Sequence, residues 1–229
     1  MNTTTFSIDH IPAVLYGEPS HSIFLFLHGK CGCKEEAAAF AEVACPRGYQ
    51  VLAADLPQHG GRSDGAAFAP WDAVPEVRRL YGYAAEHWER IALRANSLGA
   101  WFAMQALADA DLEKALFASP ILDMERLIRN MMGWAGVTEA ELCQRGEIPT
   151  DFGETLSWRY LQYAAAHPVR WNVPTAILYA GGDNLTSRTT AEDFAARHSC
   201  RLTVMEEGEH WFHTEPQLRF LRRWEEENC

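Results

Sequence analysis

The sequence lacks any run of basic residues. It contains 20 Lys and Arg against 31 Asp and Glu, which gives a formal net charge of −11. Proteins that bind nucleic acids neutralise phosphates with clustered Lys and Arg, so this balance argues against a nucleic-acid partner. The acidic residues are dispersed except at 225–227, which we interpret as a solvent-exposed helix end.

Long apolar stretches are also missing. No segment reaches the roughly 20 apolar residues that a membrane-spanning helix requires. Residues 1–17 have neither the basic start nor the continuous apolar core of a signal peptide. We therefore expect a cytoplasmic protein without a membrane partner.

Cysteine is too sparse and too irregularly spaced for a disulfide framework, with six residues in 229. Cys31 and Cys33 are separated by one residue only, and no second Cys/His pair completes a set of four metal ligands. We expect reduced thiols and no metal site. Nothing in the sequence requires an organic cofactor, and the oligomeric state is left open.

What the sequence does contain is the composition of a folded globular protein, with 48% hydrophobic and 22% charged residues. The length suits one domain with a sizeable core. No repeat, low-complexity segment or linker divides the chain. We therefore predict a single domain over 1–229.

Strand and helix patterns alternate along most of the chain. Two short β-like runs at 5–9 and 13–16 could pair as an opening hairpin. Further strands are predicted at 22–27, 50–54, 90–95, 114–118, 174–180 and 201–205, with helices at 34–45, 71–87, 97–108, 187–198 and after Pro216. Such alternation predicts an α/β fold: a mostly parallel sheet with helices on both faces.

The alternation stops between about 121 and 171. Three helices, at 124–131, 138–145 and 154–167, are predicted there without a strand, so we interpret the segment as a small helical cap. Six large side chains in it could line an apolar pocket or simply pack into the core: Met131, Met132, Trp134, Trp158, Tyr160 and Tyr163.

Ser97 stands where a predicted strand meets a predicted helix. Within Ala95-Asn96-Ser97-Leu98-Gly99, a small residue stands two positions before Ser97 and another stands two positions after it. Alone, this pattern also fits a serine that caps the following helix. It resembles the nucleophile elbow of the α/β-hydrolase superfamily, usually written GxSxG, with Ala95 in place of the first glycine. The likeness is to small bacterial-type esterases and the serine-aminopeptidase-like lineage.

Two other loops extend this resemblance. His28-Gly29 follows the strand at 22–27 and looks like the family's HG loop, which implies that the backbone N–H of Lys30 and that of Leu98 form an oxyanion hole. The segment 55–63, DLPQHGGRS, is similar to the family's D-x-P-G-H-G-x-S, with Gln58 in place of a glycine. We interpret His28, Asp55, His59 and Arg62 as structural.

The resemblance also assigns an acid and a base. Asp183 follows the strand at 174–180, and His210 lies in the loop after the last strand. Asp193 and Asp64 are weaker candidates for the acid because neither follows a clear strand end, and His213 is a weaker candidate for the base. The order Ser97, Asp183, His210 is that of the superfamily.

By this resemblance, the protein is expected to cleave an ester of a small-molecule acyl substrate through an acyl-enzyme on Ser97. Three alternatives stay open: a thioesterase, a hydrolase of small peptides or amides, and a binding module that keeps the fold without catalysis. The residues do not fix the acyl chain length.

Overall fold

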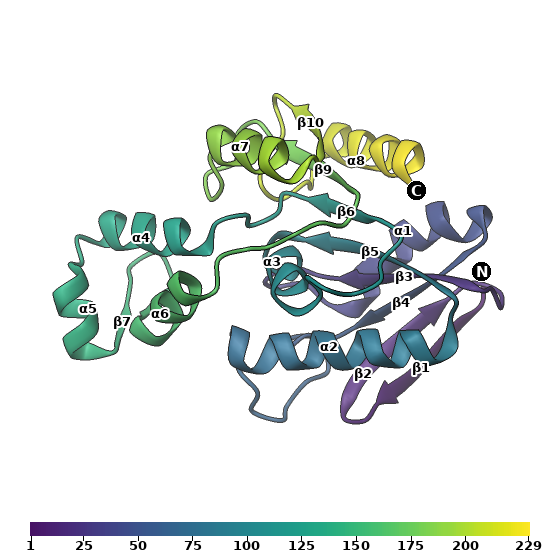
Figure 1. Ribbon diagram of the computed structural model, residues 1–229, viewed down its shortest axis with the longest axis horizontal. Coiled ribbons are helices and arrows are strands. Elements are labelled where there is room, and N and C mark those ends of the chain that lie inside the picture. The colour runs from purple at the N-terminus through teal and green to yellow at the C-terminus, as the bar shows by residue number, and fades with distance from the viewer.

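The computed structural model describes residues 1–229, which fold around a sheet of eight strands in the order β1-β2-β4-β3-β5-β6-β9-β10 (Figure 1). The six strands from β4 to β10 in this order are mutually parallel, and β2 runs antiparallel to both of its neighbours. The bounds are β1 (Thr3–Ile8), β2 (Ile11–Tyr16), β3 (Ser22–Leu27), β4 (Tyr49–Ala54), β5 (Arg90–Asn96), β6 (Ala115–Ala118), β9 (Thr175–Ala180) and β10 (Arg201–Met205). The predicted opening hairpin is present as β1 and β2.

Helices cover both faces of this sheet, which confirms the predicted fold class. One face packs against α1 (Ala37–Ala44) and α8 (Glu215–Asn228). The other packs against α2 (Pro70–His87), α3 (Ser97–Ala106) and α7 (Arg188–His198). The helix predicted at 34–45 is divided, because short 3₁₀ turns at Lys34–Glu36 and Cys45–Arg47 flank α1.

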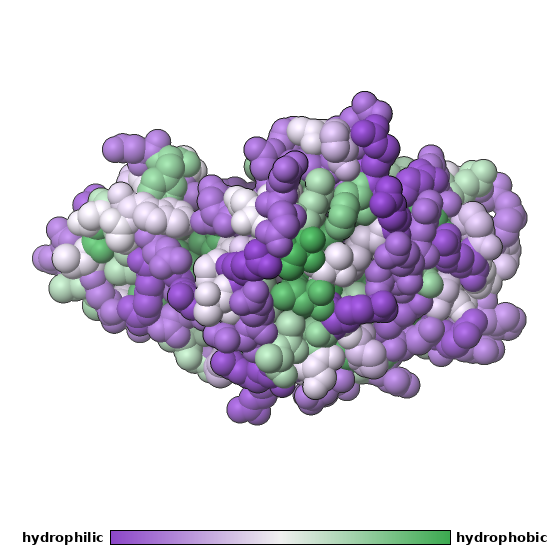
Figure 2. Space-filling view, turned by 90° about the horizontal axis from the view of Figure 1, so that it is seen from above, coloured by the Kyte–Doolittle hydropathy of each residue, from purple (hydrophilic) through white to green (hydrophobic).

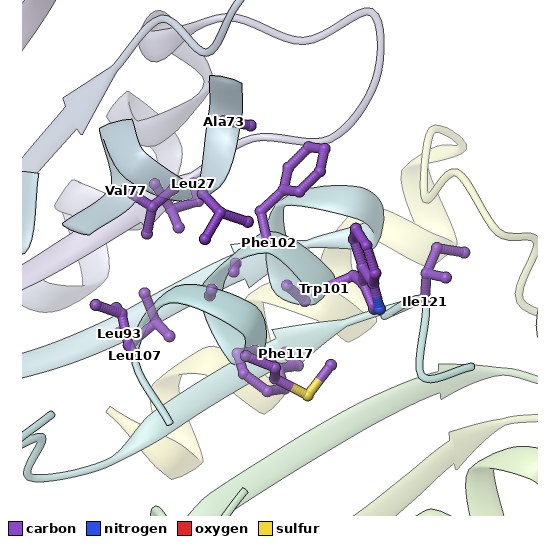
Figure 3. Packing of buried hydrophobic residues seen from close by; sticks show 14 of the residues in the cluster. Leu27, Ala73, Val77, Leu93, Trp101, Phe102, Leu107, Phe117 and Ile121 are labelled. Atoms are coloured by element: carbon purple, nitrogen blue, oxygen red, sulfur yellow. The ribbon is translucent and has the colours of Figure 1, made fainter. Parts of the chain in front are cut away.

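Burial on both faces explains the apolar strands. All six residues of β3 and all six of β9 are buried, as expected where helices cover a parallel sheet on each side. Helix α3 has no charged residue and is itself largely buried. Figure 3 shows Phe102 of α3 pointing toward α2, which carries Ala73 and Val77.

The strand order places a crevice at the end of β3. From β3 the chain moves to β4 on one side, whereas β5 leads to β6 on the other. Loops that leave the carboxyl ends of β3 and β5 therefore diverge around a topological switch point, where ligands bind in open parallel sheets. Leu27 pairs with Ala95, so the loop after Leu27 begins beside Ser97.

The segment between β6 and β9 forms the cap and lies beyond the carboxyl edge of the sheet (Figure 1). It comprises α4 (Met124–Ala135), α5 (Glu139–Arg145), β7 (Glu147–Pro149), β8 (Thr155–Ser157) and α6 (Trp158–Ala166). None of the helices in the chain is long and apolar enough to cross a bilayer.

The expectation of a cap without strands is wrong. Strands β7 and β8 form a hairpin, and the helix predicted from residue 154 begins at Trp158. Each strand has three residues and one buried side chain, Ile148 facing Leu156, which is too short for an alternating pattern to be recognised. The turn closes where Thr150 donates from both N and Oγ1 to the Glu154 carbonyl, at 2.8 and 2.7 Å.

Candidate active site

Ser97 occupies a sharp turn between β5 and α3. Its φ of +46° lies in the left-handed region, which is costly for a serine and is found at functional sites. Gly99 is required for the turn to approach β3, because a Cβ on it would lie 2.4 Å from the His28 carbonyl oxygen. Gly29 touches the turn as well, since a Cβ there would lie 3.1 Å from Ser97 Cβ. The strand-to-helix junction predicted at Ser97 is therefore present and strained.

A chain of hydrogen bonds joins Ser97, His210 and Asp183. Ser97 Oγ lies 2.8 Å from His210 Nε2, and His210 Nδ1 lies 2.8 Å from Asp183 Oδ2. A carboxylate only accepts, so Nδ1 carries the proton and donates it to Asp183. Nε2 is then left as the acceptor for the serine hydroxyl. The three residues are brought together from positions 97, 183 and 210 of the chain.

Neighbouring loops hold Asp183 and His210 in register. Asp183 follows β9 and His210 follows β10, and the loops meet where Gly182 N donates to the Gly208 carbonyl at 2.8 Å. Asp183 Oδ1 accepts from the backbone N–H groups of Leu185 at 2.7 Å and Thr186 at 3.1 Å. The Asp183 side chain is fully buried, whereas that of His210 is 17% exposed. The carboxylate is thus fixed, and the imidazole reaches the cavity.

The weaker candidates lie elsewhere. Asp64 pairs with Arg62, 2.6 Å from Nη2, and Asp193 is exposed on α7. His213 Nδ1 lies 2.7 Å from the Trp211 carbonyl oxygen and makes no contact with Ser97. The structure brings none of these three into the hydrogen-bonded chain.

Lys30 and Leu98 present backbone N–H groups beside Ser97. The Lys30 N–H has no acceptor within the protein, and Leu98 is the second residue of α3, where helical N–H groups are unpaired. Both residues line the same cavity as Ser97 and His210. The Lys30 side chain pairs with Glu154 in the β7–β8 turn, so the loop after β3 is tied to the cap. Two such donors could bind an oxyanion near Ser97.

His28 and His59 hold this loop from behind. His28 Nε2 accepts from Leu56 N at 3.0 Å, while its Nδ1 donates to the Gly29 carbonyl at 2.7 Å. Burial lowers the pKa of His28 to about 4, although the Gly29 bond opposes the shift, so the ring is neutral at pH 7. His59 Nε2 accepts from Cys31 N at 2.8 Å. These bonds use the histidines for loop geometry rather than for contact with Ser97.

Asp55 anchors the same region as an acceptor. Its Oδ2 accepts from Gly61 N at 2.9 Å, and its Oδ1 accepts from Lys34 N at 2.9 Å. Burial alone would raise the pKa of Asp55, but the hydrogen bonds from Gly61 and Lys34 lower it below its usual value. The carboxylate is therefore charged at pH 7 and committed to the turn.

An ion pair that the sequence did not suggest lies behind the turn at Ser97. Arg94 is 1% exposed and Glu225 is 5% exposed, and Arg94 Nε and Nη2 both lie 2.9 Å from Glu225 Oε1. Arg94 Nη1 also donates to Asn96 Oδ1 at 2.6 Å. The pair therefore connects α8 to the residue before Ser97. The one sign of this pair in the sequence is Arg94 itself, a charged residue within the apolar run of β5.

Ser97 and His210 open into one cavity of about 1550 Å³. Of the six large cap residues considered above, Met131, Trp134 and Tyr160 line it, whereas Met132, Trp158 and Tyr163 pack against the core. The hydroxyls of Ser119 and Tyr160 are buried in its walls without a hydrogen-bond partner. Most of the residues that line the cavity are hydrophobic, and they come from both the sheet edge and the cap.

The cysteines and other metal-binding side chains are dispersed. All six cysteines are free thiols. Nowhere do three or more His, Cys, Asp or Glu side chains gather in a way that could hold a metal ion.

Comparison with known proteins places the fold. No family model matches the sequence, and no curated protein matches it. Among solved structures, Est1E from Butyrivibrio proteoclasticus with bound ferulic acid superposes with a TM-score of 0.81 at 18% identity, covering 98% of this chain and 97% of that one. Mouse alpha/beta hydrolase domain-containing protein 10 gives 0.77 at 13% identity, covering 100% and 98%. A thioesterase domain from the curacin biosynthetic pathway gives 0.65 at 16% identity, covering 98% of each chain. The chain therefore has the α/β-hydrolase fold.

Proposed function

We propose that this protein is a serine hydrolase that cleaves esters of small-molecule acyl substrates through an acyl-enzyme on Ser97. The observation that carries the proposal is the hydrogen-bonded chain from Ser97 through His210 to Asp183, at 2.8 Å in each step, opening into the cavity. A serine hydroxyl is a weak nucleophile at pH 7 and needs such a base beside it. Neither Asp64 nor His213 could supply that geometry.

In the first half of the reaction, Ser97 Oγ attacks the ester carbonyl carbon while His210 Nε2 accepts its proton. Negative charge develops on the carbonyl oxygen, and the N–H groups of Lys30 and Leu98 stabilise it. Asp183 stabilises the imidazolium and keeps its orientation. The tetrahedral intermediate then collapses: the bond to the alcohol oxygen breaks, His210 gives that oxygen its proton, and the acyl group stays on Ser97.

The second half repeats these steps with water. His210 Nε2 takes a proton from a water molecule as the water oxygen attacks the acyl carbon. When this second intermediate collapses, the bond to Ser97 Oγ breaks and His210 returns the proton to the serine. The products are a carboxylic acid and the regenerated hydroxyl, with no oxidant or cofactor consumed.

The similar structures support an ester as the scissile bond. They include an esterase with ferulic acid bound and a monoacylglycerol lipase from Paleococcus ferrophilus, the latter at 14% identity with a TM-score of 0.67. One is a thioesterase domain, so a thioester is the second candidate substrate. The same residues would serve thioesters and small amides, because these differ in the leaving group and not in the acyl chemistry.

The test is hydrolysis of p-nitrophenyl acetate and p-nitrophenyl butyrate by the wild type and by Ser97→Ala, with intact mass after fluorophosphonate treatment. We expect activity and a single covalent adduct in the wild type, and loss of both in the variant. Butyryl thioester and butyryl anilide, assayed alongside, would rank the alternatives. A wild type that is folded, inactive toward all of them and unlabelled would favour a binding module instead.

A further inference from the structure

The cavity at Ser97 extends to both faces of the sheet. On the cap side it is bounded by side chains of the α2/α3 face and of α4, including Met131 and Ile128. On the opposite side it runs between α1 and α8, where Phe26, Phe40, Phe212 and Leu221 line it together with Ala39 and Leu218. We call this second part the α1–α8 groove. Phe26, Phe40, Phe212 and Leu221 belong to the second hydrophobic core, built on the opposite face of the sheet.

Alternation along β5 explains how one serine reaches both parts. Leu93 and Ala95 are buried on the α2/α3 face, whereas the side chains of Arg94 and Asn96 lie among the lining of the groove. Ser97 follows immediately, at the carboxyl edge where the two faces meet. A substrate bound at Ser97 can therefore extend one group under the cap and another into the groove.

The groove is apolar and accessible from solvent. Leu218 is 48% exposed and Ala39 is also exposed, whereas Phe26, Phe40 and Phe212 behind them are buried. Figure 2, a view onto the side that carries α7 and α8, shows hydrophobic residues gathered near the middle of the molecule between hydrophilic flanks. An exposed apolar surface that joins a reactive centre is typical of a ligand subsite.

The charges in the groove select against an anionic occupant. Arg94 is neutralised by its ion pair with Glu225, so it offers no free positive charge. Glu36 lines the groove as well; burial raises its pKa, although Arg94 opposes the shift. Glu225 is neutralised in the same pair, so Glu36 is the remaining carboxylate of the groove; an anion placed beside it would be repelled, and a neutral apolar group would not.

We propose that the α1–α8 groove binds the alcohol part of the ester, an uncharged apolar group, while the acyl part lies under the cap; this rests on the function proposed above. The assignment follows from the proton that His210 must deliver to the leaving oxygen. The alcohol must therefore lie on the His210 side of Ser97, and Trp211 and Phe212, which directly follow His210, line the groove. The cavity of about 1550 Å³ exceeds the roughly 300–1,000 Å³ usual for one compact ligand, so it has room for two sizeable groups.

The experiment compares three esters: ethyl butyrate, benzyl butyrate and ethyl octanoate. Ala39→Phe narrows the groove at an exposed position, and Met131→Trp narrows the space under the cap. Ala165→Phe, an exposed position of α6 that does not line the cavity, is the matched control. The readout is kcat/KM, because it reports the steps through acylation, while the alcohol is still attached.

We expect Ala39→Phe to lower kcat/KM for benzyl butyrate at least about tenfold relative to kcat/KM for ethyl butyrate. The ratio of kcat/KM for ethyl octanoate to kcat/KM for ethyl butyrate should stay unchanged. Met131→Trp should show the reverse pattern, and Ala165→Phe should change neither ratio. Leu218→Asp places a charge at the exposed rim and should also act against benzyl butyrate alone, which provides a second test should Ala39→Phe fail to fold.

Two results would overturn this assignment while leaving the hydrolase intact: equal effects of Ala39→Phe and Leu218→Asp on all three esters, or no effect on any. A selective loss of ethyl octanoate hydrolysis in Ala39→Phe would place the acyl group in the groove and would also contradict the proposal. Failure of the underlying function would look different, since the wild type would then cleave none of the esters and would not react with a fluorophosphonate.

Discussion

Breaking the buried ion pair between Arg94 and Glu225 should destabilise the protein strongly. In Glu225→Gln the guanidinium keeps its charge, is 1% exposed and loses the carboxylate that lies 2.9 Å from both Nε and Nη2. Removal of one partner of such a pair costs about 3–5 kcal/mol, because the other charge remains buried. At roughly 2–4 °C per kcal/mol for a chain of this size, Tm should fall by about 6–20 °C.

Urea unfolding followed by circular dichroism measures this cost. Glu226→Gln is the control on the neighbouring residue, whose side chain is 45% exposed and lies 3.3 Å from Arg222; it should change the free energy of unfolding by no more than about 0.5 kcal/mol. The double variant Arg94→Met/Glu225→Leu removes both charges and should recover most of the stability, as apolar replacements of buried pairs do. A cost below about 1 kcal/mol for Glu225→Gln, or additive losses in the double variant, would refute the reasoning.

Three further predictions concern Asp183, Gly99 in the turn after Ser97, and the pH dependence that His28 gives to stability. Asp183→Asn should lower kcat for ester hydrolysis by about 10⁴-fold in a folded protein, because the amide no longer holds the His210 tautomer; retention of a tenth of the activity would contradict the role. Gly99→Ala should cost about 1–3 kcal/mol and reduce activity, since its Cβ would lie 2.4 Å from the His28 carbonyl oxygen, whereas Gly133→Ala, with nothing within 4 Å, should be neutral or stabilising by urea titration. Burial lowers the pKa of His28 in the folded protein to about 4, against the ordinary 6.5 of a free histidine, so the unfolded chain binds the proton first as the pH falls. Its contribution to stability should be present in full above pH 6.5 and fall between pH 6.5 and 4 by about 3 kcal/mol, which unfolding free energies at both pH values and an NMR titration of the His28 ring would check.

Much of the candidate site could be predicted from the sequence, because the predicted strand ends indicate where its residues lie. Ser97, Asp183 and His210 each lie in the turn or loop that follows a predicted strand, and parallel strands deliver such loops to one edge of the sheet. Strand order is therefore sufficient to bring residues 97, 183 and 210 near one another. The hydrogen bonds that fix Asp183 and the left-handed φ of Ser97 are backbone details that no spacing in the sequence specifies.

Other features depend on contacts between distant residues. Arg94 interrupts an apolar strand, but its partner Glu225 is 131 residues further along, among acidic residues that read as a solvent-exposed helix end. The α1–α8 groove likewise exists only because α8 returns to α1 across the sheet. The β7–β8 hairpin was missed for another reason: a strand of three residues buries one side chain and gives no measurable period.

The pairing of Arg94 with Glu225 also sets an order of events during synthesis. At 5–20 residues per second, a ribosome needs roughly 7–26 s to add the 131 residues that separate them. Throughout that interval the guanidinium lacks the Glu225 carboxylate, which lies 2.9 Å from it in the folded protein, and a charge without that partner resists burial. The turn at Ser97 therefore gains this support only after α8 has been synthesised.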